Sequence, residues 1–343
     1  MDRIYALNES NRRKLRFMAH QSGIGVRHSV IADYSRPVQE WKFYPPTENL
    51  EPFPSLEQRM QWYNKYAAPL SVDAIRRCLA GKVHPQEITH LLTVSCTGMS
   101  APGLDLQVVE LMDLPRTIFR TSLNFMGCYA AVHALKLADA LCASAAGAKV
   151  LIVCTELCTL HFQREATMDN LTSGLLFADG SAAALVVADT HPGKGVHIDH
   201  FYSEIVSKGK KDMAWELSST GFQMTLSGYV PDLIEEDFAG LVGRALEKNQ
   251  LRPEEIRHWC IHPGGRKILE AIHKSLAFTN GHLDLSYAVL KEYGNMSSPT
   301  ILFVLQRIME RLDYEHKDTV FAAAFGPGLT VETFMATAVG PDM

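Results

Sequence analysis

The chain has 343 residues, which is enough for one large domain or for two fused halves that bury a sizeable core. Hydrophobic residues make up 47% of it and charged residues 21%, so the composition excludes a disordered or fibrous chain. The formal net charge of -5 is spread over segments of mixed sign, and no basic face for a nucleic acid is predicted.

The seven cysteines have no paired spacing, and no signal peptide precedes them, which predicts a reduced, cytoplasmic protein. No apolar run approaches the ~20 residues of a membrane-spanning helix, so we expect no membrane partner. No Cys-x-x-Cys pair is present, and the one ligand-like run, residues 258–262, has no evident fourth ligand. We therefore expect no metal and no bound cofactor.

The predicted elements alternate between helix and strand from residue 88 onward. Before that point, the first thirty residues read as a basic helix, and Pro37 and the pair Pro45-Pro46 mark an irregular stretch. Residues 88–94, 117–123 and 150–154 read as buried strands, separated by helices at 103–111 and 128–146. This alternation is typical of an α/β protein.

The second half repeats the pattern. Helices are predicted at residues 231–249, 266–276 and 297–312, and strands at 259–261, 320–325 and 329–338. Gly326-Pro327-Gly328 forms a tight turn between the last two strands. No low-complexity linker divides the chain. We therefore expect two similar layered α/β halves, residues 1–195 and 196–343, packed together with helices on both faces of each sheet.

Cys128 lies where a strand turns into an Ala-rich helix, directly after Gly127. At a helix start its sulfur would meet unsatisfied N–H groups and the positive end of the helix dipole, which predicts a lowered thiol pKa and a nucleophile. Gly127 permits the sharp turn that presents the side chain. Free cysteines are more often small buried hydrophobic residues, so position alone does not decide its role.

Two further residues stand at turns of the predicted fold. His262 ends a short strand and runs into Pro263-Gly264-Gly265, where layered α/β proteins collect catalytic groups, although a lone histidine is more often structural. Asn295 precedes a helix, where asparagine commonly serves as a turn or cap residue. Neither position is decisive by itself.

Taken together, residues 124–130, 259–265, 292–298 and 325–332 resemble the chalcone-synthase-like type III polyketide synthases of the thiolase superfamily. The run Phe-Gly-Pro-Gly-Leu-Thr-Val-Glu at 325–332 is the most specific match, and the resemblance extends from about Arg12 to the C-terminus. It implies the thiolase fold with αβαβα layers and a homodimer. It also implies a starter acyl-CoA and malonyl-CoA as substrates, and decarboxylative Claisen condensation to a pyrone or phenolic product without metal or bound cofactor.

The resemblance also assigns roles by position. Cys128 resembles the nucleophile that takes the starter from coenzyme A, and His262 resembles the residue that pairs with its thiolate. His262 and Asn295 would donate hydrogen bonds to the thioester oxygen of malonyl-CoA and so stabilise the enolate formed on decarboxylation. Phe177 matches a phenylalanine that shields the site, although its residue type also fits ordinary strand core. Further residues at pocket-lining positions are Cys96, Thr97, Cys158, His161, Trp215, Met224, Ser297 and Phe325.

Some positions depart from the plant pattern. Trp215 stands where chalcone-forming members have glycine, and Met224 stands where they have a gatekeeper phenylalanine. An indole in place of a hydrogen should shrink the cavity and remove the space for a coumaroyl ring. Together with Cys96, Trp215 resembles bacterial members that use small malonyl-type starters. We therefore expect acetyl, malonyl or simple aliphatic starters.

The coenzyme A site and the subunit interface also depart from the pattern. Lys14 and Arg16 are candidate contacts for the coenzyme A phosphates, but Phe17 and Gln21 occupy two positions that are basic in the family. Ala101 replaces a larger residue on the loop that crosses the dimer interface. A strand and a helix usually precede the segment that Met1 opens, so we expect either another strand over that sheet edge or a shortened chain.

Three alternatives use similar residues. A ketoacyl carrier-protein synthase III shares the Cys, His and Asn set, but the Gly-Pro-Gly turn argues against it. A papain-like cysteine hydrolase would show Cys-Gly-Ser-Cys-Trp around its nucleophile, and Cys128 has no such neighbours. A noncatalytic acyl-binding protein is expected to lack one member of the triad, and all three are present. Release of coenzyme A and carbon dioxide from malonyl-CoA would separate these alternatives.

Overall fold

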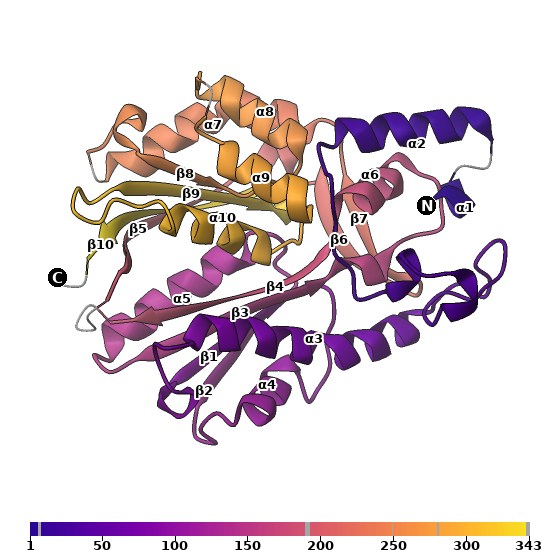
Figure 1. Ribbon diagram of the computed structural model, residues 1–343. Helices are drawn as coiled ribbons and strands as arrows, with labels where there is room; N and C mark the ends of the chain where they lie inside the picture. The colour runs from indigo at the N-terminus through magenta and orange to yellow at the C-terminus, as the bar shows by residue number, and fades with distance from the viewer. Residues whose placement is uncertain (6–7, 189–192, 249, 280, 341–343) are drawn as a thin grey trace.

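A computed structural model describes the chain at residues 1–5, 8–188, 193–248, 250–279 and 281–340. Its elements form five layers in the order helix, sheet, helix, sheet, helix (Figure 1). Three buried apolar clusters fill the spaces between neighbouring layers. The α/β class and the layered arrangement predicted from the sequence are confirmed.

The first sheet has the strand order β2-β1-β3-β4. Its strands are β1 (His90–Ser95), β2 (Phe119–Asn124), β3 (Lys149–Leu157) and β4 (Asp179–Val187). The first three are parallel, and β4 pairs antiparallel with β3. Because β3 is buried along nearly its whole length, its side chains form the continuous apolar run of a sheet that is covered on both faces.

The second sheet has the order β5-β10-β9-β8. Its strands are β5 (Gly195–Ile205), β8 (His258–Ile261), β9 (Thr319–Gly326) and β10 (Thr330–Val339). β9 and β10 pair antiparallel around the predicted tight turn, where Gly328 has φ 76°. This backbone conformation favours glycine, so the turn is formed as the sequence predicts.

Helices cover both sheets. The outer layers contain α3 (Leu56–Leu79) and α4 (Leu104–Met112) on one side and α7 (Val230–Glu247) and α8 (Arg266–Ser275) on the other. The middle layer contains α5 (Ala130–Ser144) and α10 (Pro299–Met309) between the two sheets (Figure 1). The alanines at 131, 134 and 138 of α5 are fully buried, so their small side chains let this helix pack closely in the middle layer.

The helix α9 (Asp284–Tyr293) packs within the layers, beside α8, α10 and β8 (Figure 1). The remaining elements lie to one side of the layers, around the site described below. They are the helices α1 (Asp2–Tyr5), α2 (Glu9–Gln21) and α6 (Met168–Leu176) and the hairpin strands β6 (Met213–Ser218) and β7 (Gly221–Leu226). In Figure 1, α2, α6 and the β6–β7 hairpin lie together at the end of the molecule opposite the C-terminus.

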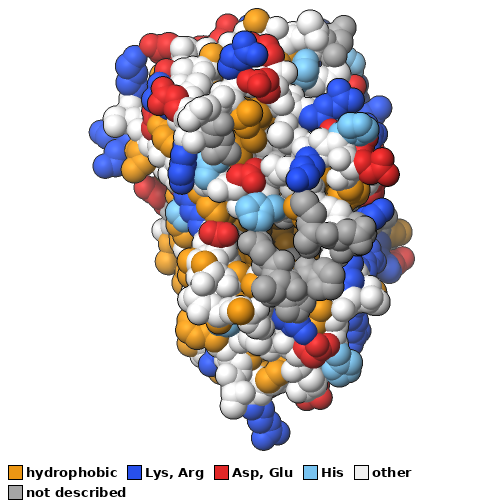
Figure 2. Space-filling view, turned by 90° about the vertical axis from the view of Figure 1, so that its left-hand side faces the viewer, with side chains coloured by type: hydrophobic (Ala, Val, Ile, Leu, Met, Phe, Trp, Pro, Cys, Tyr) orange, Lys and Arg blue, Asp and Glu red, His pale blue; other side chains and the backbone are white. Residues whose placement is uncertain are grey.

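Most predicted elements are present, with shifted ends. The helix predicted from residue 128 begins at Ala130, and the strand predicted at 88–94 spans His90–Ser95. The predicted end of α7 at Asn249 lies outside the described residues. Of the helices in the described residues, none combines the length and apolar character that crossing a bilayer requires. On the face in Figure 2, cationic and anionic side chains are interspersed.

Candidate active site

A cavity of about 980 Å³ lies where loops from both sheets meet. Cys96, Cys158 and His262 reach it directly after β1, β3 and β8, and Cys128 reaches it from the loop between β2 and α5. These loops follow the carboxyl ends of parallel strands, where layered α/β proteins place their ligands. The cavity therefore lies where ligands bind in other layered α/β proteins.

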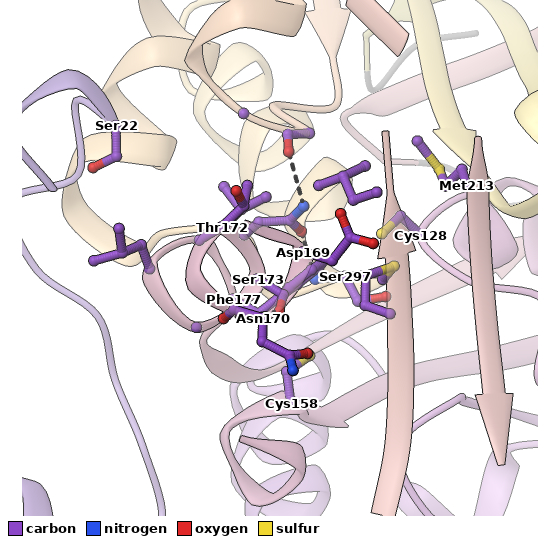
Figure 3. A pocket seen from close by; sticks show the side chains of 18 of the residues that line it. Ser22, Cys128, Cys158, Asp169, Asn170, Thr172, Ser173, Phe177, Met213 and Ser297 are labelled. Carbon is purple, nitrogen blue, oxygen red and sulfur yellow. Dashed lines mark hydrogen bonds between the residues drawn. The ribbon is translucent and has the colours of Figure 1, made fainter. Parts of the chain in front are cut away.

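The loop that carries Cys128 has an unusual backbone. Phe125 has φ 59° and Gly127 has φ 83°, so the chain turns sharply before α5. A Cβ atom on Gly127 would lie 2.2 Å from Cδ of Pro327, in the turn between β9 and β10. Only glycine therefore fits, and the sharp turn predicted at Gly127 is confirmed. The thiol faces the cavity beside Ser297 (Figure 3).

The predicted lowering of the Cys128 pKa is wrong for the free enzyme. Burial raises the pKa of this thiol to about 11, although hydrogen bonds with Ser297 and Asn295 act in the opposite direction. Cys128 is only 8% exposed, and α5 begins two residues later, at Ala130. Because removal from water disfavours the thiolate, desolvation outweighs the helix dipole.

His262 is held at the end of β8 with its ring on the cavity wall. Its backbone N–H donates to the carbonyl of Ala323 at 2.9 Å, and its side chain is 1% exposed. Neither ring nitrogen has a hydrogen-bond partner among the described residues, and burial lowers the pKa of His262 to about 3. Burial thus favours the neutral form of both the thiol and the imidazole. Opposite charges formed together would stabilise each other in this poorly hydrated space.

Asn295 is fixed by hydrogen bonds from both its backbone and its side chain. It forms a bridge with Phe177, through bonds from Asn295 N to Leu176 O (3.0 Å) and from Ala178 N to Asn295 O (2.9 Å). Its Oδ1 accepts from the N–H of Ser297 at 2.8 Å, and its Nδ2 donates to the carbonyl of Gly264 at 3.3 Å. The amide group is therefore oriented beside the cavity, and it also forms a hydrogen bond with the thiol of Cys128.

All nine residues predicted to line the site lie on the cavity wall. They are Phe177, Cys96, Thr97, Cys158, His161, Trp215, Met224, Ser297 and Phe325. Phe177 follows the end of α6 and is half-buried, so it is not the strand core residue that its type also allowed. Figure 3 shows further α6 side chains around the same space, of which the sequence interpretation named none: Asp169, Asn170, Thr172 and Ser173.

Trp215 forms part of one wall. Its indole N–H donates to the carbonyl of Cys96 at 2.7 Å, and its ring packs edge-on against His161 and Phe222. His161 is itself fixed, since Nε2 lies 2.7 Å from the carbonyl of Thr97 and Nδ1 accepts from the N–H of Phe222. Burial lowers the pKa of His161 to about 3, so this imidazole is neutral. The indole is therefore a rigid surface.

A buried carboxyl group that the sequence interpretation missed lies behind this wall. Glu156 accepts hydrogen bonds from the N–H of Cys96 at 2.9 Å, from Thr97 Oγ1 at 2.8 Å and from Ser298 Oγ at 2.7 Å. Burial raises its pKa, while these hydrogen bonds lower it. Glu156 thus joins the loop after β1 to the segment before α10. The sequence pattern around Glu156 is that of a buried strand, and it does not reveal that this carboxyl group connects two loops.

The mouth of the cavity differs from the expectation for coenzyme A contacts. Lys14 and Arg16 are exposed on α2 and do not line the cavity, whereas Phe17 and Gln21 of the same helix do. Cationic side chains reach the lining from elsewhere in the chain, at Arg27, Arg266 and Lys267. Among the described residues, no group of three or more histidine, cysteine or acidic residues is placed to hold a metal ion.

Ala101 lies away from this cavity. It is exposed on the loop between β1 and α4 and lines a second hollow of about 300 Å³. Met99 from the same loop and Ser122 and Asn124 from β2 also line this hollow. The loop and the sheet edge formed by β2 thus share one surface.

Comparison with known proteins identifies relatives over nearly the whole chain. Residues 6–190 match the family model of the N-terminal domain of chalcone and stilbene synthases, and residues 198–340 match that of the C-terminal domain. The alpha-pyrone synthesis polyketide synthase-like Pks18 of Mycobacterium tuberculosis is 33% identical over 285 residues, which cover 81% of this chain and 72% of Pks18. Probable polyketide synthase 1 of Dictyostelium discoideum is 28% identical over 93% of this chain, which spans 10% of that protein.

Solved structures agree with this assignment. PKS-I from the brown alga Ectocarpus siliculosus has a TM-score of 0.89 at 27% identity, with 98% of this chain and 92% of that chain covered. The 1,3,6,8-tetrahydroxynaphthalene synthase of Streptomyces coelicolor A3(2), a bacterial type III polyketide synthase, has a TM-score of 0.86 at 26% identity, with the same coverage. The predicted thiolase fold is confirmed, and a ketoacyl carrier-protein synthase III is not favoured. This chain belongs to the chalcone and stilbene synthase family and is a type III polyketide synthase, an acyltransferase.

Proposed function

We propose that the enzyme transfers a starter acyl group from coenzyme A to Cys128 and extends it by decarboxylative condensation with malonyl-CoA. The observation that carries this proposal is the meeting of Cys128, His262 and Asn295 on one cavity wall. The three residues come from three separate loops, and the buried imidazole of His262 has both nitrogens unpaired. Such an imidazole can exchange a proton with a thiol and donate a hydrogen bond to a substrate.

Loading begins with transfer of the Cys128 proton to His262. The thiolate then attacks the thioester carbonyl, a new carbon–sulfur bond forms on Cys128, and the bond to coenzyme A breaks. The imidazolium returns its proton to the departing thiolate, so the step is balanced. The raised pKa of Cys128 means that this proton transfer has to occur with substrate bound, when water is excluded and the two charges form together.

Extension uses His262 and Asn295 as hydrogen-bond donors. Loss of carbon dioxide from malonyl-CoA leaves an enolate, whose negative oxygen would accept from the ring N–H of His262 and the side-chain N–H of Asn295. The enolate carbon attacks the acyl group on Cys128 and releases the thiolate. Phe177 beside Asn295 keeps this region apolar, which favours conversion of a charged carboxylate into neutral carbon dioxide.

We propose small or aliphatic starters and cyclisation to a pyrone or phenolic product. Trp215 and Met224 line the cavity where chalcone-forming members have glycine and phenylalanine, so the wall has less space for an aromatic starter. The indole of Trp215 is fixed by its hydrogen bond to Cys96. The name of Pks18 associates that relative with alpha-pyrone synthesis, which supports the pyrone. The cavity of about 980 Å³ has room for a chain of several condensed units.

We propose that the enzyme is a homodimer whose interface includes the Ala101 loop and β2. The strand β2 forms an edge of the first sheet, and Phe119 on it is 50% exposed. Met99, beside Ala101, is 46% exposed. An edge strand with exposed apolar side chains is a template for pairing, and a second copy related by a twofold axis would cover it.

Two coarser features belong to the same proposal. A division into residues 1–195 and 196–343 assigns one four-stranded sheet to each half, except for Gly195, the first residue of β5. In the described part of the chain, free thiols are present at Cys78, Cys96, Cys128, Cys154, Cys158 and Cys260, which fits work in a reducing compartment such as the cytoplasm.

The test follows acyl transfer and decarboxylation separately. Purified enzyme is given acetyl-CoA and malonyl-CoA, and intact-protein mass, released carbon dioxide and extended products are measured. Cys128→Ala should lose both the acyl adduct and the products, whereas Cys78→Ala, at a half-buried cysteine outside the cavity, should keep both. Extended products from a folded Cys128→Ala enzyme would refute the assignment. Products only from malonyl carrier protein would instead support a carrier-protein-dependent condensing enzyme.

A further inference from the structure

The mouth of the cavity carries positive charge at a place where sequence resemblance does not put it. Of the described residues that line the cavity, three carry a lysine or arginine side chain: Arg27, Arg266 and Lys267. Lys14 and Arg16 on α2 are outside this lining. Coenzyme A carries a diphosphate and a 3′-phosphate at the end far from its thioester, so its binding requires cations near the mouth.

Arg27 is already used within the protein. Its guanidinium donates to the carbonyl oxygens of Gly174 at 2.7 Å and Phe177 at 2.8 Å, and thereby holds the end of α6. The side chain is exposed, and both bonds come from the same nitrogen, Nη1. We assign Arg27 to the support of α6, and two cations remain for a ligand.

Arg266 and Lys267 are the first two residues of α8, and both are exposed. Lys267 has no ion pair within the described ranges. Arg266 donates to Glu270 at 2.8 Å, in a pair whose side chains are 44% and 45% exposed. Exposed pairs of this kind are weak, so a phosphate can replace the carboxylate. Asp169 is the other acidic residue on the cavity wall.

The start of α8 adds to this charge. Gly265 supplies no side-chain cap, and the first turn of the helix contains no acidic residue. The first backbone N–H groups of a helix lack intrahelical acceptors and form the positive end of its dipole, where phosphates bind well. Two side chains and the helix start therefore present positive charge to one space.

A second observation connects this space to the reaction centre. His262, whose buried ring nitrogens are both unpartnered, lines the same cavity and lies four residues before Arg266. Four residues of extended chain span at most about 14 Å. One continuous turn thus carries the unpartnered imidazole at its inner end and the cations at its outer end, a separation that an extended pantetheine arm can cover.

We infer that Arg266 and Lys267, and not Lys14 and Arg16 of α2, hold the phosphates of the coenzyme A thioester. The inference rests on the proposed use of coenzyme A thioesters. It explains how α2 can carry the uncharged Phe17 and Gln21 at the mouth.

The test compares substrates that differ only in their phosphates. Rates are measured with malonyl-CoA, malonyl-dephospho-CoA and malonyl-N-acetylcysteamine for Lys267→Ala, Arg266→Ala and the double variant. For each single variant we expect the ratio of kcat/KM for malonyl-CoA to kcat/KM for malonyl-N-acetylcysteamine to fall about tenfold, through KM. The wild-type KM for malonyl-CoA should also rise with salt, and less steeply in the double variant.

Two lysines serve as controls. Lys274→Ala changes an exposed lysine in the last turn of α8, which pairs with Glu235, and Lys14→Ala changes the candidate on α2. Each should change the ratio by less than about twofold. A tenfold fall with Lys14→Ala, or an unchanged ratio with the double variant, would overturn the inference while the proposed function stands. Absence of turnover with both thioesters in the wild type would instead overturn the proposed function.

Discussion

Replacing Gly127 by alanine tests the turn that presents Cys128. The residue has φ 83°, and a Cβ atom there would lie 2.2 Å from Cδ and 2.8 Å from Cγ of Pro327. Left-handed backbone costs an L-residue roughly 1–2 kcal/mol. Overpacking against a proline ring that is fixed in the β9–β10 turn adds roughly 1–3 kcal/mol. We therefore expect Gly127→Ala to lower the free energy of unfolding by about 2–5 kcal/mol.

The measurement is urea denaturation of the purified variant, followed by turnover of malonyl-CoA under conditions where it is folded. Turnover should fall even when most molecules are folded, because the added methyl group displaces the loop that carries the Cys128 thiol. The matched control is Gly243→Ala in the middle of α7, where nothing lies within 4 Å of the added Cβ. That change should raise stability by about 0.5–1 kcal/mol. A Gly127→Ala protein with wild-type stability and turnover would refute the reasoning.

Three other outcomes are expected. Because burial holds the pKa of His262 and His161 near 3, the unfolded state binds their protons between about pH 6.5 and 3, and stability falls as pH falls through that window. Each imidazole contributes about 1.4 kcal/mol per pH unit to the slope of the free energy of unfolding against pH. His262→Asn should therefore reduce this slope by that amount in urea titrations at pH 4.5 to 6.5. An unchanged slope would contradict the expectation. Phe119→Lys should shift the protein to monomers in analytical ultracentrifugation, whereas Tyr229→Lys, at the exposed residue directly before α7, should not. Trp215→Gly should improve turnover of coumaroyl-CoA relative to acetyl-CoA, and wild-type preference for coumaroyl-CoA would contradict the volume argument.

The layered fold could be predicted because its core elements carry strong local patterns. The buried strands β1 and β3 and the turn around Gly328 follow from apolar runs and glycine chemistry. α3 was not predicted, although Ser55 caps it and Arg76 and Arg77 close it, because Pro69 interrupts its middle. The β6–β7 hairpin has no buried residue in β6 and only Gly221 and Phe222 buried in β7, so its apolar pattern is weak.

The electrostatics of the site could not be predicted from sequence position. A cysteine before a helix suggests a low pKa, but the sign of the shift depends on how much water reaches the sulfur. Burial of Cys128 under loops from both sheets is a tertiary property, and so is the absence of a partner for the imidazole of His262. In the assembled site, burial raises the pKa of the thiol and lowers the pKa of the imidazole, which favours the neutral form of each. Cys128, His262 and Asn295 could be identified from the sequence because the motifs around them are specific. Those motifs do not determine the charge states of the side chains.

The size of the cavity, like the electrostatics of the site, depends on the tertiary structure and cannot be predicted from one sequence position. Replacing glycine by tryptophan in a sequence comparison predicts a smaller space only if every other wall stays in place. Here the indole bonds to Cys96 and packs on Phe222, so it occupies part of a wall that also depends on His161. Side chains of α2 and α6 also line the cavity, and the replacement of glycine by tryptophan carries no information about their positions. Trp215 thus determines the shape of one surface near Cys96, and selection against a rigid aromatic starter follows from that surface more directly than from total volume.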